Sequence, residues 1–255
     1  MLRSFLTRYR LFALLIFVLG GWAVLKDRYD LAGALLFLLL VAVALGAVFP
    51  RLQFYGPFQC RLATTRRQVV LTFDDGPDPA STPPLLDVLK EAGVRATFFG
   101  VGHRVDEFPK LAARIVREGH RLENHSYSHL HRTNIMTVKR LRTEMERTQA
   151  AIQRATGVVP TLFRPPMGLS NPRVFRAARA LGLTVVGWSA RGLDTVRKDP
   201  ERIVKRIVRQ LKPGAIILLH DGCIPADRLL RTVKTLLDTL ETLGYEVVPL
   251  ESLPS

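Results

Sequence analysis

The sequence has very few cysteines. Only Cys60 and Cys223 occur among its 255 residues, and they lie in unrelated contexts. Two isolated cysteines predict neither a disulfide framework nor a zinc–thiolate site. The sequence also lacks the aromatic-plus-basic strand and the recognition helix that are typical of nucleic-acid-binding modules. Nucleic acid is therefore not the expected partner, although the formal net charge is +15.

Charged residues are absent from two apolar runs near the N terminus, Leu11–Leu25 and Leu31–Phe49. The second run has 19 residues, which is long enough to cross a bilayer as a helix. The first has 15 and spans a bilayer only if it tilts little. We therefore predict that residues 1–50 form a membrane anchor of one or two transmembrane helices, which places the protein in the cell membrane. An uncleaved signal-like segment and a buried helix pair are the alternatives.

The basic residues around these runs do not settle the orientation. Three precede the first run, two lie between the runs, and four follow the second: Arg51, Arg61, Arg66 and Arg67. By the positive-inside rule, a hairpin would have both ends in the cytoplasm. If only the second run spans, the N-terminal arginines place the following domain outside. The sequence leaves both arrangements open.

The positive charge extends over the whole chain. Residues 1–67 contain nine basic and two acidic side chains, and the remainder contains 28 basic and 20 acidic ones, giving +7 and +8. We interpret residues 51–67 as a basic linker. A basic domain on a membrane anchor favours attraction to anionic lipid head groups, or to an anionic lipid-linked or cell-wall substrate.

From residue 68 onward, apolar runs typical of buried strands alternate with stretches of helical period. The runs lie near residues 69–73, 96–100, 121–124, 161–164, 184–188, 215–219 and 246–249. The helical stretches are about 83–92, 107–118, 137–156, 172–181, 200–211 and 226–243. This alternation implies parallel strands joined by right-handed crossovers. We predict that residues 68–255 form a distorted (β/α)7 TIM-like barrel, with a doubly wound open sheet as the alternative.

Polar clusters follow four of the predicted strands. They are Asp74-Asp75 in LTFDDGP, His125 and His129 in NHSYSH, Arg164 in RPPMG, and His220 in ILLHDG. The carboxyl ends of barrel strands carry the active site in such folds. We therefore expect these side chains to meet on one face of the barrel.

The spacing of the two histidines suggests a metal site. Because His125 and His129 are four residues apart, a helical turn would aim both imidazoles at one ion. With one carboxylate they would form a two-His, one-Asp set that leaves positions for water and substrate. Asp74 and Asp75 repel each other unless their roles differ. Asp75 could bind the ion while Asp74 accepts a proton from bound water.

The strings T-F-D-D-G-P, N-H-S-x-S-H, R-P-P-x-G and L-L-H-D resemble, in this order, the motifs of the polysaccharide deacetylase family. This is the NodB-homology family, or carbohydrate esterase family 4. The resemblance covers about residues 68–250 and leaves out the predicted anchor. It implies a hydrolase that removes an N-acetyl group from an amino sugar.

The resemblance also implies residue roles at the metal site. Asp75, His125 and His129 would bind a divalent metal, which is usually zinc in this family. Asp74 would act as general base on the metal-bound water. Arg164 would hold Asp74 in place through a charged hydrogen bond.

Three further roles are implied away from the metal. His220 would act as general acid and protonate the departing amine, and Asp194 resembles the acidic residue that orients this histidine. Leu218 resembles the side chain that lines the pocket for the acetyl methyl group.

The sequence departs from the family pattern at two positions. Met167 stands where the family often has an aromatic residue, and Thr195 follows Asp194 where a tryptophan is common. Trp188 lies six residues before Asp194 and could fill part of that wall. We expect Met167 and Trp188 to shape the substrate pocket without affecting the metal site.

These features favour a membrane-anchored, metal-dependent deacetylase of an amino sugar in a cell-wall-type polysaccharide. One alternative is a deacylase of a lipid-linked sugar at the cytoplasmic face. Another is a catalytically silent glycan-binding module on a membrane anchor. The complete metal set, together with Asp74 and His220, argues against the silent module.

Overall fold

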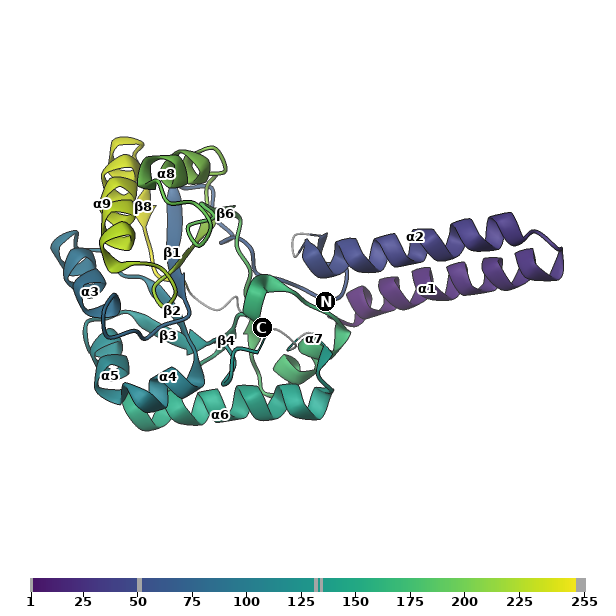
Figure 1. The fold of residues 1–255 in the computed structure, drawn as a ribbon, viewed down its shortest axis with the longest axis horizontal. Helices are drawn as coiled ribbons and strands as arrows, with labels where there is room; N and C mark the ends of the chain where they lie inside the picture. The colour runs from purple at the N-terminus through teal and green to yellow at the C-terminus, as the bar shows by residue number, and fades with distance from the viewer. Residues whose placement is uncertain (1, 50–51, 131–132, 134, 251–255) are drawn as a thin grey trace.

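The structure is a computed structural model that describes residues 2–49, 52–130, 133 and 135–250 (Figure 1). An N-terminal helical hairpin projects from an α/β domain (Figure 1). Residue 1 of the predicted anchor and residues 251–255 of the predicted catalytic domain lie outside the described residues. Residues 50–51, at the predicted boundary between anchor and linker, do so too. The division into anchor, linker and catalytic domain remains a prediction.

The hairpin consists of α1 (Leu2–Leu25) and α2 (Tyr29–Val48). Within the described residues, only Tyr29–Ala47 is long and apolar enough to cross a membrane, with a mean hydropathy of 2.4. The apolar part of α1, Leu11–Leu25, is shorter. Large side chains such as Phe17 and Phe37 are exposed on the hairpin. Apolar surface of this extent is unusual in contact with water, which supports the predicted anchor.

The α/β domain is built on one parallel sheet with the order β5-β4-β3-β2-β1-β7-β6, and β8 pairs with β1 beside this path. The strands are β1 (Gln68–Asp74), β2 (Thr97–Gly100), β3 (Arg121–Asn124), β4 (Leu162–Phe163), β5 (Thr184–Val185), β6 (Ala190–Arg191), β7 (Ala215–His220) and β8 (Glu246–Val247). Every strand pairing is parallel. The predicted distorted (β/α)7 barrel is confirmed, and the doubly wound open sheet is wrong.

Helices cover the outside of the sheet (Figure 1). They are α3 (Thr82–Glu91), α4 (Gly102–Glu107), α5 (Pro109–Arg117), α6 (Val138–Thr156), α7 (Pro172–Ala180), α8 (Pro200–Val208) and α9 (Ala226–Thr242), with the 3-10 turn η3 (Pro166–Gly168). The side-chain oxygen of Asn171 accepts hydrogen bonds from two backbone N–H groups in the first turn of α7, and Asp199 does the same for α8. Each residue therefore caps the start of its helix. The sequence prediction missed the short α4 and β6 and the turn η3.

The alternation along β1 decides what faces the barrel interior. Val69, Leu71 and Phe73 join the outer core beneath the helices. Val70 points inward and packs in a second cluster, whose other members are Phe99, Leu162, Val186, Ile216 and Leu250. Successive strand side chains alternate between faces, so Thr72 and Asp74 also point inward. Asp74 therefore lies at the carboxyl end of a filled barrel interior.

The barrel is open between β5 and β6, which do not pair within the described residues. Residues of the predicted linker cover this side. Gln59 forms an isolated β-bridge with Val186, and Arg61 forms one with Ala215. Phe58 is buried, with its ring centroid 5.3 Å from that of Phe175. This part of the predicted linker therefore packs into the domain.

Candidate active site

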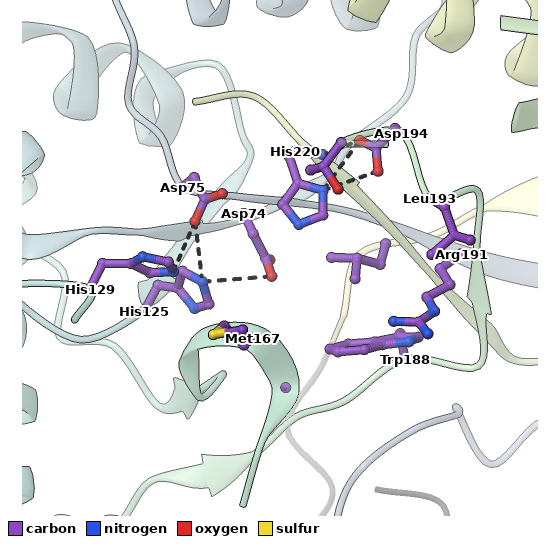
Figure 2. Close-up of a pocket in the computed structure, with 13 residues that line it drawn as sticks. Asp74, Asp75, His125, His129, Met167, Trp188, Arg191, Leu193, Asp194 and His220 are labelled. Carbon is purple, nitrogen blue, oxygen red and sulfur yellow. Dashed lines mark hydrogen bonds and ion pairs between the residues drawn. The ribbon is translucent and has the colours of Figure 1, made fainter. Parts of the chain in front are cut away.

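Two polar side chains meet at the carboxyl ends of neighbouring strands. Asp74 on β1 and His220 on β7 are paired in the sheet register. Residues paired in this way project to the same face, so both side chains enter the barrel mouth. Asp74 is buried and His220 is half-buried. The pairing places a carboxylate and an imidazole beside one cavity (Figure 2).

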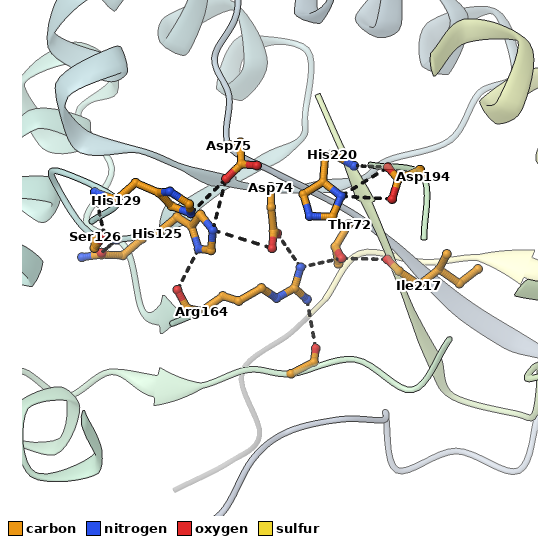
Figure 3. A network of polar contacts seen from close by, with 12 residues as sticks. Thr72, Asp74, Asp75, His125, Ser126, His129, Arg164, Asp194, Ile217 and His220 are labelled. Carbon is orange, nitrogen blue, oxygen red and sulfur yellow. Dashed lines mark hydrogen bonds and ion pairs between the residues drawn. The ribbon is translucent and has the colours of Figure 1, made fainter. Parts of the chain in front are cut away.

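Arg164 holds the Asp74 carboxylate from below (Figure 3). Its guanidinium donates to Asp74 Oδ1 at 2.6 Å, to Thr72 Oγ1 at 2.8 Å and to the Gly187 carbonyl at 3.0 Å. The guanidinium also lies 4.0 Å from the ring centroid of Phe99. Arg164 is fully buried, so these contacts replace its hydration. The network fixes the rotamer of Asp74 and leaves its Oδ2 toward His125.

Sequence reasoning missed Thr72. Its hydroxyl accepts from Arg164 and donates to the Ile217 carbonyl at 2.7 Å, so it links the guanidinium to the neighbouring strand. Its position could have indicated this role, because Thr72 lies two residues before Asp74 and therefore on the same face of the strand.

Asp75, His125 and His129 form a cluster whose candidate ligand atoms all lie within 4.8 Å of one another. Asp75 Oδ1 is 3.5 Å from His125 Nε2 and 3.2 Å from His129 Nε2. It is buried without a hydrogen-bond partner. An orphaned buried carboxylate oxygen between two imidazole nitrogens fits a divalent cation that accepts one Asp and two His ligands.

The tautomer of His125 supports this fit. Its Nδ1 lies 2.8 Å from the Arg164 carbonyl oxygen, which can only accept a hydrogen bond. Nδ1 therefore carries the proton, and in the neutral ring Nε2 presents a lone pair to the cluster. Carbonyl partners orient metal-binding histidines in this way. The same carbonyl belongs to the residue that holds Asp74, so Arg164 organises both halves of the site.

The electrostatics of the cluster also suit a cation. Burial acts to raise the pKa of Asp75, but His125, His220 and His129 outweigh it and hold this pKa well below its usual range. Burial acts to lower the pKa of His125, whereas Asp74 and Asp75 raise it. The two carboxylates thus create a strongly negative position that attracts either protons or a metal ion.

The predicted helical turn from His125 to His129 is wrong. These residues form an irregular bend in which Ser126 and His129 have φ values of 65° and 47°. Side chains between the histidines hold the bend: Ser126 Oγ accepts from the His129 N–H, and the backbone N–H and hydroxyl of Ser128 donate to Glu144. Left-handed backbone outside glycine is costly and often marks functional sites.

Asp194 orients His220 from the far side of the cavity. Its Oδ2 accepts from the His220 backbone N–H at 2.9 Å, and its two oxygens lie 3.1 and 3.2 Å from His220 Nδ1. Burial on its own acts to lower the pKa of His220. The hydrogen bond and the charge of Asp194 outweigh burial and, with Asp74 and Asp75, raise this pKa to about 9. His220 is therefore a cation at neutral pH, with Nε2 free to donate.

Removing the charge of Asp194 is expected to shift the pH profile. The raised pKa keeps His220 protonated as pH rises toward 9. In Asp194→Asn, His220 should lose its proton at lower pH, so the alkaline limb of kcat/KM should move down by about one to two pH units. Profiles of acetate release between about pH 6 and 10 measure this shift. Asp199→Asn, at an exposed helix cap, is the control, and a uniform fall in rate with an unmoved limb would contradict the prediction.

The predicted pocket residues Leu218, Met167 and Trp188 all line a cavity of about 270 Å³, which Asp74, Asp75 and His220 also line. Figure 2 shows Met167 and Trp188 facing the polar groups. Gly168 allows close packing there, since a Cβ at this position would lie 2.0 Å from the Trp188 ring. Thr195 also lines the cavity. Sequence reasoning missed Arg191 and Leu193, which complete the wall opposite Met167 (Figure 2).

An acid–base pair beside an Asp–His–His cluster, at the carboxyl ends of barrel strands, defines the class of protein as a hydrolase with a candidate metal site. The chain matches the polysaccharide deacetylase family over residues 61–186. A chitooligosaccharide deacetylase from Bradyrhizobium sp. is 36% identical over 199 residues, which cover 73% of this chain and 90% of the relative.

Solved structures agree with this assignment. A peptidoglycan N-acetylglucosamine deacetylase has a TM-score of 0.73 and 29% identity, covering 80% of this chain and 94% of that one. A family 4 pseudoenzyme from Bacillus anthracis has a TM-score of 0.69 and 28% identity, covering 77% and 68%. The chain therefore belongs to the polysaccharide deacetylase family, carbohydrate esterase family 4. It is a glycan deacetylase, a hydrolase of the amide bond in N-acetylated sugars.

Proposed function

We propose that this chain is a membrane-anchored, metal-dependent enzyme that hydrolyses the N-acetyl amide of an amino sugar in a cell-wall-type polysaccharide. The observation that carries the proposal is the convergence of Asp75, His125 and His129 beside the Arg164-held Asp74. The apolar hairpin supports a place in the cell membrane. Names of relatives point to the sugar, since those proteins act on chitooligosaccharide or peptidoglycan.

The three cluster residues would hold one divalent metal, for which zinc suits the ligand set. A metal held there would lower the pKa of a water molecule and polarise the amide carbonyl. Asp75 supplies the negative charge, and the two imidazoles supply neutral nitrogen donors. The site geometry separates this carboxylate from Asp74, whose Oδ1 is already occupied by Arg164.

Asp74 and His220 divide the proton transfers. Asp74 is the general base: its carboxylate takes the proton from the attacking water, and the hydrogen bond from Arg164 holds the carboxylate in position. His220 is the general acid: its Nε2–H donates to the leaving nitrogen, so that the C–N bond breaks to an amine and acetate. Asp194 stabilises the protonated imidazole before transfer. General acid or base catalysis of each proton transfer raises the reaction rate by about 10²- to 10⁴-fold.

The cavity wall sets the position of the acetamido group. Leu218 lies two residues before His220 on the same face of β7, so it offers an apolar contact for the acetyl methyl group. Met167 and Trp188 flank the opening where the sugar ring would lie. Aromatic and thioether groups suit the apolar face of a sugar, and the surrounding polar groups suit its hydroxyls.

A glycan-binding module without activity is the competing function, and a family 4 pseudoenzyme shares this fold. In this chain the three candidate metal ligands, Asp74 and His220 are all present and oriented toward one cavity. A module that only binds glycan has no need of an Arg164-held base or an Asp194-held acid. The complete arrangement favours catalysis.

Acetate release tests the proposal. Full-length protein in detergent is incubated with N-acetylated chitooligosaccharides and peptidoglycan fragments, with and without a chelator. We expect acetate release that the chelator abolishes and that zinc or another divalent transition ion restores. Metal content is measured in parallel. Binding of glycan without acetate release in the metal-loaded protein would favour the silent module, and chelator-resistant release would exclude metal dependence.

A further inference from the structure

The helical hairpin is bonded to a loop of the active site. The backbone N–H of Ser170 donates to the Ala47 carbonyl near the end of α2 at 3.3 Å. Met167, three residues earlier in the same loop, lines the cavity. A second hydrogen bond joins the hairpin to the packed part of the predicted linker: the Tyr55 hydroxyl donates to the Val43 carbonyl at 2.7 Å. If the hairpin lies in a membrane, the cavity must open close to the membrane surface.

Exposed apolar side chains lie on the loops around the mouth of the barrel. Ile135, Met167 and Val196 are 73%, 58% and 75% exposed. They come from the loops that follow β3, β4 and β6, so all three lie on the carboxyl-end face that carries the site. Apolar side chains on loops around a basic surface are typical of a contact with the membrane interface.

The α7 helix extends this surface with positive charge. It lies next to the base of the hairpin (Figure 1) and begins two residues after Ser170. Arg173, Arg176 and Arg179 are exposed on it, and its sequence contains no acidic residue. Arginines near a bilayer are attracted by anionic head groups.

Arg191 is an exposed residue that lines the cavity. Its guanidinium lies 5.7 Å from the ring centroid of Trp188, opposite Met167 (Figure 2). Among the residues that the structure describes, no Asp or Glu oxygen lies within ion-pair distance of it. The carboxylates that line the cavity, Asp74, Asp75 and Asp194, are directed at Arg164 and the histidines. Arginine presents a planar fork that suits the two oxygens of a phosphate.

We propose that the natural substrate is an N-acetyl amino sugar carried on a lipid phosphate in the same membrane, and that Arg191 contacts the phosphate. This inference rests on the proposed deacetylase chemistry and replaces the wall polysaccharide with a membrane-borne sugar as its substrate. The hairpin and the apolar rim bring the cavity to the head groups, and Arg191 selects the anionic linkage beside the sugar. A neutral wall polymer would use neither feature.

Matched substrates test the inference on full-length, metal-loaded protein reconstituted in vesicles of zwitterionic and anionic phospholipid. Four carry the same N-acetyl amino sugar: a polyprenyl phosphate-linked form, a neutral alkyl glycoside in the vesicle, a soluble sugar phosphate and a neutral soluble oligomer. We expect the highest kcat/KM for the phosphate-linked lipid form. Arg191→Gln should lower the preference for phosphate over neutral substrates by about 10- to 100-fold, and Arg191→Lys should lose less.

A second variant separates the membrane contact from phosphate recognition. Val196→Asp should slow turnover of the vesicle-borne substrates, since a carboxylate at the rim is repelled by anionic lipid, while the soluble sugar phosphate is turned over as before. An unchanged phosphate preference in Arg191→Gln would overturn the inference. A neutral oligomer that is turned over as well as the phosphate-linked lipid would do so too, leaving the deacetylase function intact. Acetate release from none of the four would count against that function itself.

Discussion

Asp74→Asn is expected to reduce acetate release by about 10²- to 10⁴-fold, the range for loss of a general base. Asparagine has nearly the same shape as aspartate, and its carbonyl oxygen can still accept from Arg164, which donates to Asp74 at 2.6 Å. The amide cannot take a proton from water at neutral pH. The substitution therefore removes the proton acceptor while it preserves the surrounding hydrogen bonds.

The matched control is the neighbouring carboxylate. Asp75→Asn should also lose activity, but by weakening metal binding, because Asp75 Oδ1 lies between the two histidine nitrogens. Metal content after dialysis and single-turnover acetate release separate the two variants. Asp74→Asn should retain its metal and Asp75→Asn should not. Loss of metal in Asp74→Asn would show that Asp74 is itself a ligand.

The sequence predicted the elements of this fold better than their pairings. Apolar runs and helix caps located seven strands and six helices, because both signals are local. The register that pairs Asp74 with His220 joins residues 146 positions apart, and no local pattern specifies it. The β6 strand, with two residues, is too short to show any period. Its existence depends on the hydrogen bonds that β7 offers.

Tertiary contacts also decided where the predicted linker lies. Residues 51–67 are basic and irregular, features that typify a linker. Yet Tyr55 and Phe58 are buried, and Gln59 accepts and donates backbone hydrogen bonds beside β5. Two buried aromatics offset the entropy of ordering this segment. The ring that packs against Phe58 belongs to Phe175, more than a hundred residues away.

The candidate site shows the same limit. The identities of the polar residues and their places after strands were readable from the sequence. The division of labour between Asp74 and Asp75 had two supports, the need to separate like charges and the family resemblance. Arg191 gave no signal, because an exposed arginine has no period and belongs to no motif quoted for this sequence. Only the cavity shows that it faces the same space as His220.

Arg164→Met is expected to damage stability and activity together. Methionine is about as long as the aliphatic stem of arginine but has no charge, so Asp74 would be left as a buried carboxylate without its cation. Removing one partner of a buried ion pair costs about 3–5 kcal/mol in the free energy of unfolding. Denaturant unfolding in detergent with chelator present, followed by tryptophan fluorescence in a Trp22→Phe background, measures this cost without a contribution from metal binding.

The double variant Arg164→Met with Asp74→Asn tells whether that cost comes from the stranded charge. With both charges removed, the desolvation penalty of the carboxylate disappears, so the double variant should be more stable than the sum of the single effects by about 1–3 kcal/mol. Activity should not recover, because the proton acceptor is gone. If stability were strictly additive, the guanidinium would act through Thr72, Gly187 and Phe99 and not through Asp74. If the free energies of unfolding are not additive and the rate does not recover, the role of Arg164 is to hold the Asp74 carboxylate in a buried position. The barrel interior would otherwise disfavour a charge there.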